Sequence, residues 1–315
     1  MELKKWYMKM NNQLQYAIDL DVLFGTSEKK NNPNAGTGLK ILSCGAGMQS
    51  TALALMSCEN KVRNNSHPQV PIYDLIVFCD MGWEPPWVYE QVNFIKGACE
   101  ACGIPFKVLE TNLYGDYIEK FGKSRVPSIP FWSVDENGKK AKMRRHCTID
   151  KKIIAIQKYV RYEILGYKFK ERCRKCDKGA HEMHIGISSE EDHRIFESMN
   201  PMFETKFPLV EMGLTRADNY KYCLEVWGLE TKASACGYCP FHRNYFFKYL
   251  KDNCPDCYNA VTELDDVIDK MQPYTPIRSK LYISRSRKRI RDLTPEECMD
   301  AQTFEYNGQQ IWNGF

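Results

Sequence analysis

The residues best suited to chemistry lie near position 45, where a glycine-rich turn joins an apolar run to a helical pattern. Residues 39–56 read LKILSCGAGMQSTALALM. Glycines let the backbone bend with its N–H groups facing inward, and a helix that starts there adds partial positive charge, a combination that favours phosphate. Ser50 and Thr51 add hydroxyl donors. We therefore expect the turn to bind nucleotide phosphates; a turn without a ligand is the alternative.

Two familiar phosphate-binding patterns fit this turn poorly. No Lys precedes the Ser/Thr pair, so it is not a Walker P-loop. The dinucleotide fingerprint G-x-G-x-x-G has Ser50 at its third glycine position. The residues that we expect to bind the nucleotide are Ser43, Gly45, Gly47, Gln49, Ser50, Thr51 and, as a ring that stacks on a base, Trp83. Simple packing is the alternative role for Trp83.

The cysteines form a second group of reactive residues. The chain holds 14, and eight of them form four C-x-x-C pairs. In an intracellular protein such pairs are read as metal or cluster ligands before disulfides. Cys99 and Cys102 share one helix face, which favours core filling. A zinc site is expected for two of the other pairs, with reduced surface thiols as the alternative and His181 as a substitute ligand; its members are Cys173, Cys176, Cys254 and Cys257.

The elements that must position these residues alternate along the first 110 residues. Apolar strands are expected at 39–43, 75–79 and 106–109, with helices at 50–58 and 85–103 between them. This order predicts an α/β fold with a doubly wound, mostly parallel, Rossmann-like sheet. Further elements are expected as a helix at 148–165, a strand at 183–188 and helices at 215–226 and 259–271.

The chain divides into three predicted parts. Residues 1–38 form an N-terminal extension, 39–215 a nucleotide-binding α/β domain, and 216–315 a cysteine-rich, mostly helical and basic C-terminal region. The basic tract at 278–291 has many Lys and Arg and no acid, which suits RNA or DNA, or else a solvated face. No apolar run is long enough to span a bilayer, and no signal-peptide core precedes the domain, so we expect a cytoplasmic protein that does not bind a membrane.

Ligands of open α/β sheets bind at the carboxyl ends of the strands. The sequence places four polar segments there: 45–51, 80–84, 142–148 and 188–194. Arginine grips phosphate or sulfate with two donors, and an acid beside it can serve a ribose or a metal ion. Our candidate catalytic residues are Asp80, Arg144 and Arg194.

Four segments together carry a resemblance to a known family. The turn resembles the pyrophosphate loop S-G-G-x-D-S of N-type ATP pyrophosphatases, in the variant form with Gln at the position of Asp. The other three resemble conserved steps of phosphoadenosine-phosphosulfate (PAPS) reductase-like proteins: 80–84 (DMGWE), 144–148 (RRHCT) and 234–242 (SACGYCPFH). The similarity runs from about residue 39 to 290. It implies a PAPS reductase-like member of the adenine nucleotide alpha hydrolase superfamily that binds ATP or PAPS with Mg²⁺.

The resemblance also implies a metal group. In cluster-bearing relatives, cysteines at a helix start join a distant C-x-x-C around a 4Fe-4S cluster. This chain offers Cys147, Cys236 and Cys239, which would hold three irons and leave one open. A cysteine from elsewhere could complete the set, and zinc is the alternative metal.

Three functions are consistent with these residues. The first is an ATP-dependent sulfur transferase that adenylates an acceptor such as a nucleic acid, with a cluster or a sulfur donor protein supplying sulfur. The second is a sulfonucleotide reductase, although the expected E-C-G-x-H tail is absent and Cys298 is the only cysteine after 257. The third is a nucleotide sensor or partner-binding protein without catalysis.

Overall fold

The computed structural model describes residues 38–120, 129–274 and 277–312. The predicted N-terminal extension lies outside these residues except for Gly38. The chain divides into two compact units, each made of three stretches. Unit 1 comprises Met1–Cys79, Pro86–Leu109 and Ile154–Lys232, and unit 2 comprises Asp80–Pro85, Glu110–Ile153 and Ala233–Phe315. From the sequence we expected contiguous parts with boundaries after residues 38 and 215. The two units alternate along the sequence, because the segments that follow β2 and β3 belong to the same compact unit as the residues from 233 onward.

Unit 1 is built on a five-stranded sheet in the order β3-β2-β1-β6-β7. Its strands are β1 (Lys40–Cys44), β2 (Leu75–Asp80), β3 (Phe106–Glu110), β6 (His181–Ile185) and β7 (Phe203–Lys206). All strands are parallel, and Ser43 of β1 lies level with Val77 of β2 and Ile185 of β6. The α/β class and the parallel sheet are thereby confirmed. The strand expected at 183–188 begins two residues earlier and ends three residues earlier, and β7 was not expected.

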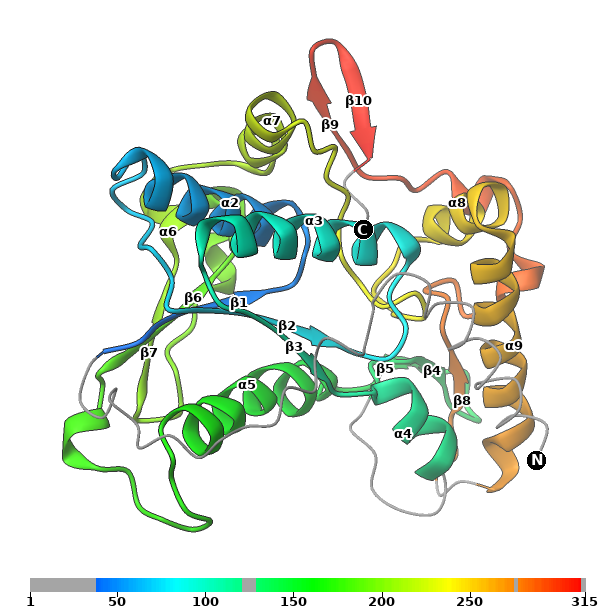
Figure 1. Ribbon diagram of the computed structural model, residues 1–315. Coiled ribbons are helices and arrows are strands. Elements are labelled where there is room, and N and C mark those ends of the chain that lie inside the picture. Colours follow the sequence, from blue (N-terminus) through cyan, green and yellow to red (C-terminus); the bar gives the residue numbers. More distant parts are fainter. Residues whose placement is uncertain (1–37, 121–128, 275–276, 313–315) are drawn as a thin grey trace. The chain divides into compact units, whose positions relative to one another are not determined.

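Helices cover both faces of this sheet, as a doubly wound fold requires (Figure 1). One face carries α2 (Met48–Arg63), α3 (Pro86–Cys102), α6 (Pro208–Glu211) and α7 (Arg216–Trp227); the other carries α5 (Ile154–Tyr159), which lies between the π-helical turns η3 (Ile149–Ile153) and η4 (Val160–Ile164). Side chains alternate along β1, so that Leu42 enters the first core and Ile41 the second. Both side chains are fully buried.

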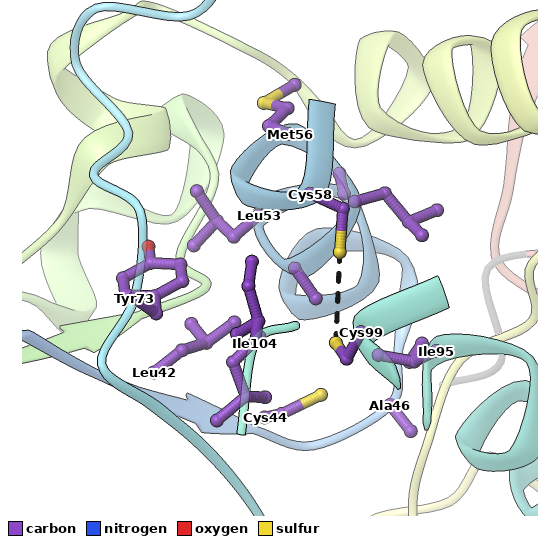
Figure 2. Close-up of a cluster of buried hydrophobic side chains, with 14 of the residues drawn as sticks. Leu42, Cys44, Ala46, Leu53, Met56, Cys58, Tyr73, Ile95, Cys99 and Ile104 are labelled. Atoms are coloured by element: carbon purple, nitrogen blue, oxygen red, sulfur yellow. Dashed lines mark hydrogen bonds between the residues drawn. The ribbon is translucent and has the colours of Figure 1, made fainter. Parts of the chain in front are cut away.

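Figure 2 shows the core under α2 and α3. Leu42 and Cys44 from β1 lie below Leu53 from α2 in a cluster that excludes water. The Sγ atoms of Cys58 and Cys99 are 3.8 Å apart in it. Cys99 therefore fills the core, as its helix position indicated. The hydrogen bond to Cys99, together with burial, raises the pKa of Cys58, so this thiol stays protonated.

Unit 2 contains strands as well as helices. A three-stranded antiparallel sheet has the order β5-β4-β8, with β4 (Trp132–Val134), β5 (Lys140–Lys142) and β8 (Lys280–Tyr282). The helices are α4 (Leu113–Lys120), α8 (Asn244–Asn253) and α9 (Pro255–Met271), and a hairpin joins β9 (Thr303–Tyr306) to β10 (Gln309–Trp312). Short turns of 3₁₀-helix are η5 (Lys175–Asp177) and η6 (Ser189–Arg194) in unit 1 and η7 (Gln272–Tyr274), η8 (Ile290–Asp292) and η9 (Glu296–Cys298) in unit 2. In the described residues, no helix is both long and apolar enough to cross a membrane.

Candidate functional site

The glycine-rich turn connects the end of β1 to the start of α2 in unit 1. Ala46 adopts a left-handed conformation with a φ of 54°, which turns the chain sharply after Gly45. The Gly45 N–H donates to Ser50 Oγ at 3.1 Å, and the Thr51 N–H donates to the Gly47 carbonyl at 2.9 Å. Gly47 is therefore the N-cap of α2, and the N–H groups of the first helical turn follow shortly after the central strand.

This turn lies where the order of strands reverses. From β1 the chain continues to β2 and β3 on one side of the sheet, whereas β6 and β7 extend the other side. Gly186 follows β6 directly and approaches the start of α2. A Cβ atom at Gly186 would lie 2.7 Å from Ser50 N and 3.0 Å from the carbonyl carbon of Gln49. Such a switch point is where doubly wound folds bind nucleotides.

An ion-pair network from Glu191 continues the site. Gln49 Nε2 donates to Glu191 Oε2 at 2.9 Å. Glu191 Oε1 accepts from Arg194 at 2.6 Å and from Arg216 at 2.8 Å. Burial opposes ionisation here, but the charges of Arg216 and Arg194 outweigh it and lower the pKa of Glu191. Glu190 also pairs with Arg216, at 4.0 Å, so two carboxylates and two guanidinium groups lie in one network beside Gln49.

Glu191 and Arg216 were not among the residues selected from the sequence. Glu191 stands three residues before Arg194 in the polar SSEEDHR segment, and this spacing was the available signal. Arg216 follows Thr215, whose hydroxyl accepts from the Asp218 N–H and caps α7. Arg216 is thus the first residue of a capped helix, and this position in the sequence does not indicate that its side chain pairs with Glu191.

Buried Gln91 fixes the turn from the side of α3. Its Nε2 donates to the Ala46 carbonyl and, at 3.0 Å, to the Lys232 carbonyl. The Lys232 N–H donates back to Gln91 Oε1. Gln91 is 3% exposed and sits between Val88 and Val92 on the apolar face of its helix. Burying a polar side chain costs free energy unless it is hydrogen-bonded. The presence of Gln on the apolar face of a helix was therefore the signal in the sequence for this residue.

Thr51 has a buried hydroxyl at the same place. Its side chain is fully buried, and Oγ1 has no hydrogen-bond partner among the residues that the structure describes. Buried polar atoms are ordinarily bonded, so the Thr51 hydroxyl is a candidate contact for a group that binds at the turn. Ser43 lies one residue before the end of β1 and is partly buried.

The predicted cluster ligands come together in unit 2 around a buried carboxyl. Cys236 donates from Sγ to Glu84 Oε1 at 3.6 Å. The thiols of Cys147 and Cys239 are close enough to act electrostatically on Cys236. Burial raises the pKa of Glu84 to about 7, against the opposing charge of Lys152. The group is therefore half protonated near neutral pH.

Burial also sets the protonation of the thiols. It raises the pKa of Cys236 and of Cys239, although Arg145 and Lys152 act in the opposite direction on Cys239. A bound metal ion reverses this balance and deprotonates its thiols. The donor set suits iron or zinc, but the described residues contain no group of three or more His, Cys, Asp or Glu side chains arranged to hold a metal ion.

An aromatic stack supports the turn that carries these cysteines. The rings of Trp83 and Tyr238 are nearly parallel, 7° apart in tilt and 5.6 Å between centroids. A Cβ on Gly237 would lie 2.8 Å from the Trp83 ring, so only glycine fits there. Trp83 is 4% exposed. This geometry favours packing over the stacking on a nucleotide base that the sequence suggested.

The candidate catalytic residues belong to different units. Asp80 ends β2 and, with Arg144, belongs to unit 2, whereas Arg194 and the glycine turn belong to unit 1. Asp80 Oδ1 accepts from the Gly82 N–H at 2.8 Å, so its carboxylate caps its own turn. Arg144 is exposed, and Arg194 is half exposed and paired with Glu191.

The four cysteines of the expected zinc site also divide between the units. Cys173 is partly buried and Cys176 exposed, both in unit 1. Cys254 and Cys257 lie in unit 2, and their sulfurs are bonded to each other in a disulfide. Disulfide sulfurs are not thiolates and do not bind zinc. Zinc binding by the reduced pair stays a prediction.

The basic tract is largely paired within unit 2. Arg289 bonds to Asp265 at 2.9 Å and also to Asp269. Other ion pairs of the tract are Lys288 with Glu297 at 2.8 Å, Arg291 with Asp266 at 3.1 Å and Arg285 with Asp300 at 3.8 Å. Only exposed Arg278 and Lys280 precede this paired stretch. The tract therefore offers a nucleic acid much less charge than its sequence suggested.

Comparison with protein-family models gives no match to the chain, and comparison with curated proteins gives none either.

Proposed function

We propose that this chain is an adenine-nucleotide-binding enzyme of the ATP pyrophosphatase type, related to the PAPS reductase-like proteins that its motifs resemble. The observation that carries the proposal is the meeting of the Gly45–Thr51 turn with Gly186 at the switch point of the sheet. A parallel sheet, a helix start and a close glycine contact at one place are the elements of a phosphate site.

The residues of unit 1 have distinct roles in this proposal. The first-turn N–H groups of α2 and the hydroxyl of Thr51 donate to the β- and γ-phosphates. Arg194 and Arg216 neutralise the charge that develops as pyrophosphate leaves. Glu191 holds both guanidinium groups and Gln49 in position. Mg²⁺ bound to the phosphates adds to this neutralisation.

The reaction that we propose is adenylation of an acceptor followed by sulfur transfer. A carbonyl oxygen of the acceptor attacks the α-phosphorus, the new P–O bond forms, and the bond to the β-phosphate breaks to release pyrophosphate. A sulfur nucleophile then attacks the activated carbon, and AMP leaves with the original oxygen. A 4Fe-4S cluster on Cys147, Cys236 and Cys239, or a donor protein, would supply that sulfur, with zinc as the alternative metal.

The structure gives less support to a sulfonucleotide reductase. Such an enzyme needs a reactive thiolate, and Cys298 is the only cysteine after residue 257. Its side chain is 7% exposed, and burial raises its pKa. Both properties disfavour a nucleophile.

The reaction class is tested by product analysis with the full chain. ATP is incubated with RNA, with DNA or without an acceptor, and pyrophosphate is measured. Release that depends on one acceptor is expected. Sulfite released from PAPS with thioredoxin, and no pyrophosphate from ATP, would replace the proposal with the reductase. If ATP binds but is not turned over under any condition, the result would instead support a nucleotide sensor.

A further inference from the structure

A second group of basic residues lies in unit 1, on the loop between η4 and β6. Figure 1 shows the path of the chain before β6. Residues 168–178 read KFKERCRKCDK, and we name them the 168–178 loop. Five of its cations are exposed and form no ion pair with any residue in the described ranges: Lys168, Lys170, Arg172, Lys175 and Lys178. This is the reverse of the 278–291 tract, whose cations are mostly paired.

An exposed aromatic ring stands among these cations. Phe169 is 80% exposed, and Lys170 Nζ lies 5.5 Å from the centre of its ring. Lys170 adopts a left-handed conformation with a φ of 62°, so the chain turns sharply next to the ring. A large apolar side chain left in water beside unpaired cations is the combination that binds unpaired bases and the phosphates that join them.

Buried side chains hold the C-terminal end of the loop in place. Tyr167 donates to Asp177 at 2.5 Å, and Asp177 lies 3.3 Å from His181. Asp177 and His181 are fully buried. Arg161 and Arg174 lie over the Tyr167 ring at 4.5 and 4.2 Å. These contacts fix the backbone at both ends of the loop, close to the exposed cations.

We propose that the 168–178 loop binds single-stranded nucleic acid, with Phe169 stacking on a base and Lys168, Lys170 and Arg172 contacting phosphates. The loop precedes β6, so it lies at the amino-terminal edge of the sheet, whereas the glycine turn lies at the carboxyl-terminal edge. Binding at the loop therefore needs neither ATP nor the proposed reaction.

The test is fluorescence anisotropy with labelled oligo-U and oligo-dT of about 12 nucleotides and the full chain. Replacing Lys168, Lys170 and Arg172 together by Gln should weaken binding at least tenfold. It should also reduce the slope of log affinity against log salt by about 2, since each lost phosphate contact contributes about 0.7. Phe169→Ala should weaken binding at least about fivefold, the low end for loss of one stacked base.

Two matched variants separate this surface from others. Met199→Ala removes another exposed apolar side chain of unit 1. Arg278→Gln with Lys280→Gln removes two exposed cations of the other tract that form no ion pair within the described residues. Both should bind as the wild type does, and thermal unfolding checks that every variant folds. The proposal would be overturned if the triple variant bound as the wild type does, or if only the 278/280 variant lost binding. Equal affinity for duplex DNA or for poly-glutamate would overturn it as well. Comparison of oligo-U with oligo-dT shows whether the loop prefers RNA or DNA.

Discussion

Two carboxyl groups, partly buried Glu191 and fully buried Glu84, have pKa values shifted in opposite directions. Glu191 is held ionised by Arg194 and Arg216 beside the glycine turn. Glu84 is held partly protonated by burial beside the thiol of Cys236. The first arrangement suits a site that positions cations for phosphates. The second suits a site that takes its compensating charge from a bound cation.

Glu191→Gln should lower the free energy of unfolding at pH 7 by about 1–3 kcal/mol, because charged hydrogen bonds to two arginines are lost. The folded-state pKa of Glu191 lies below its unfolded value, so its stabilisation is present above about pH 4.5 and is lost as the pH falls through the folded pKa. Urea unfolding of both proteins from about pH 2.5 to pH 8 covers this range and measures the difference. A difference that grows in acid would contradict the assigned shift.

In protein freed of metal by a chelator, Glu84→Gln should raise the free energy of unfolding at high pH, whereas Glu191→Gln lowers it. The wild-type carboxyl has a folded pKa of about 7 against 4.5 unfolded, so stability is lost as the pH rises between these values. At pH 8 the Gln variant should be more stable by roughly 3 kcal/mol, and the gain should vanish near pH 4.5. A gain that is the same at every pH would show that Glu84 is not a titrating buried acid.

At the scale of elements, the hydrophobic pattern predicts the sheet well. The strands β1, β2 and β3 lie within one residue of their expected ends because each is a short apolar run between polar turns. The strands of unit 2 carry no such signal, since β5 reads Lys140-Ala141-Lys142 and is defined only by its pairing. The β9–β10 hairpin could have been predicted from Asn307-Gly308, whose φ values of 49° and 75° suit a two-residue turn.

Gly97 gives a clean test of helix α3. It lies in the exposed interior of the helix, and a Cβ there would meet nothing within 4 Å. Gly97→Ala should raise the free energy of unfolding by about 0.5–1 kcal/mol through the higher helix propensity of Ala. Chemical denaturation measures this, and a loss of stability would mean that the position is not an open helical site.

At the scale of the whole molecule, the sequence predicted which residue types would gather but not how they are used. The 278–291 tract looked unpaired because its acidic partners lie elsewhere in the chain, at Asp265, Asp266 and Asp300 among others. Similarly, nothing in the spacing of Cys173 and Cys254 showed that they belong to different compact units. Pairings that depend on distant segments are outside the reach of local patterns.

The metal content of the full chain tests the cysteine group. Purified under exclusion of oxygen, the protein should contain iron and be brown. Cys147→Ser, Cys236→Ser and Cys239→Ser should each lose most of it, and Cys102→Ser, a partly buried thiol of unit 1, should not. Metal content should fall as the pH is lowered, because the thiols must be deprotonated to bind. A colourless protein with stoichiometric zinc would replace the cluster with a zinc site.

The most direct test of the account is the binding of ATP to wild type and to Gly186→Ala, measured by calorimetry, with Gly97→Ala as the control. The Gly186 variant should fold but bind ATP at least about tenfold more weakly, which is about 1.4 kcal/mol, because its Cβ displaces the start of α2. The Gly97 variant should bind as the wild type does. ATP binding of wild-type strength in a folded Gly186→Ala protein, or none in the wild type, would contradict a nucleotide site at this turn.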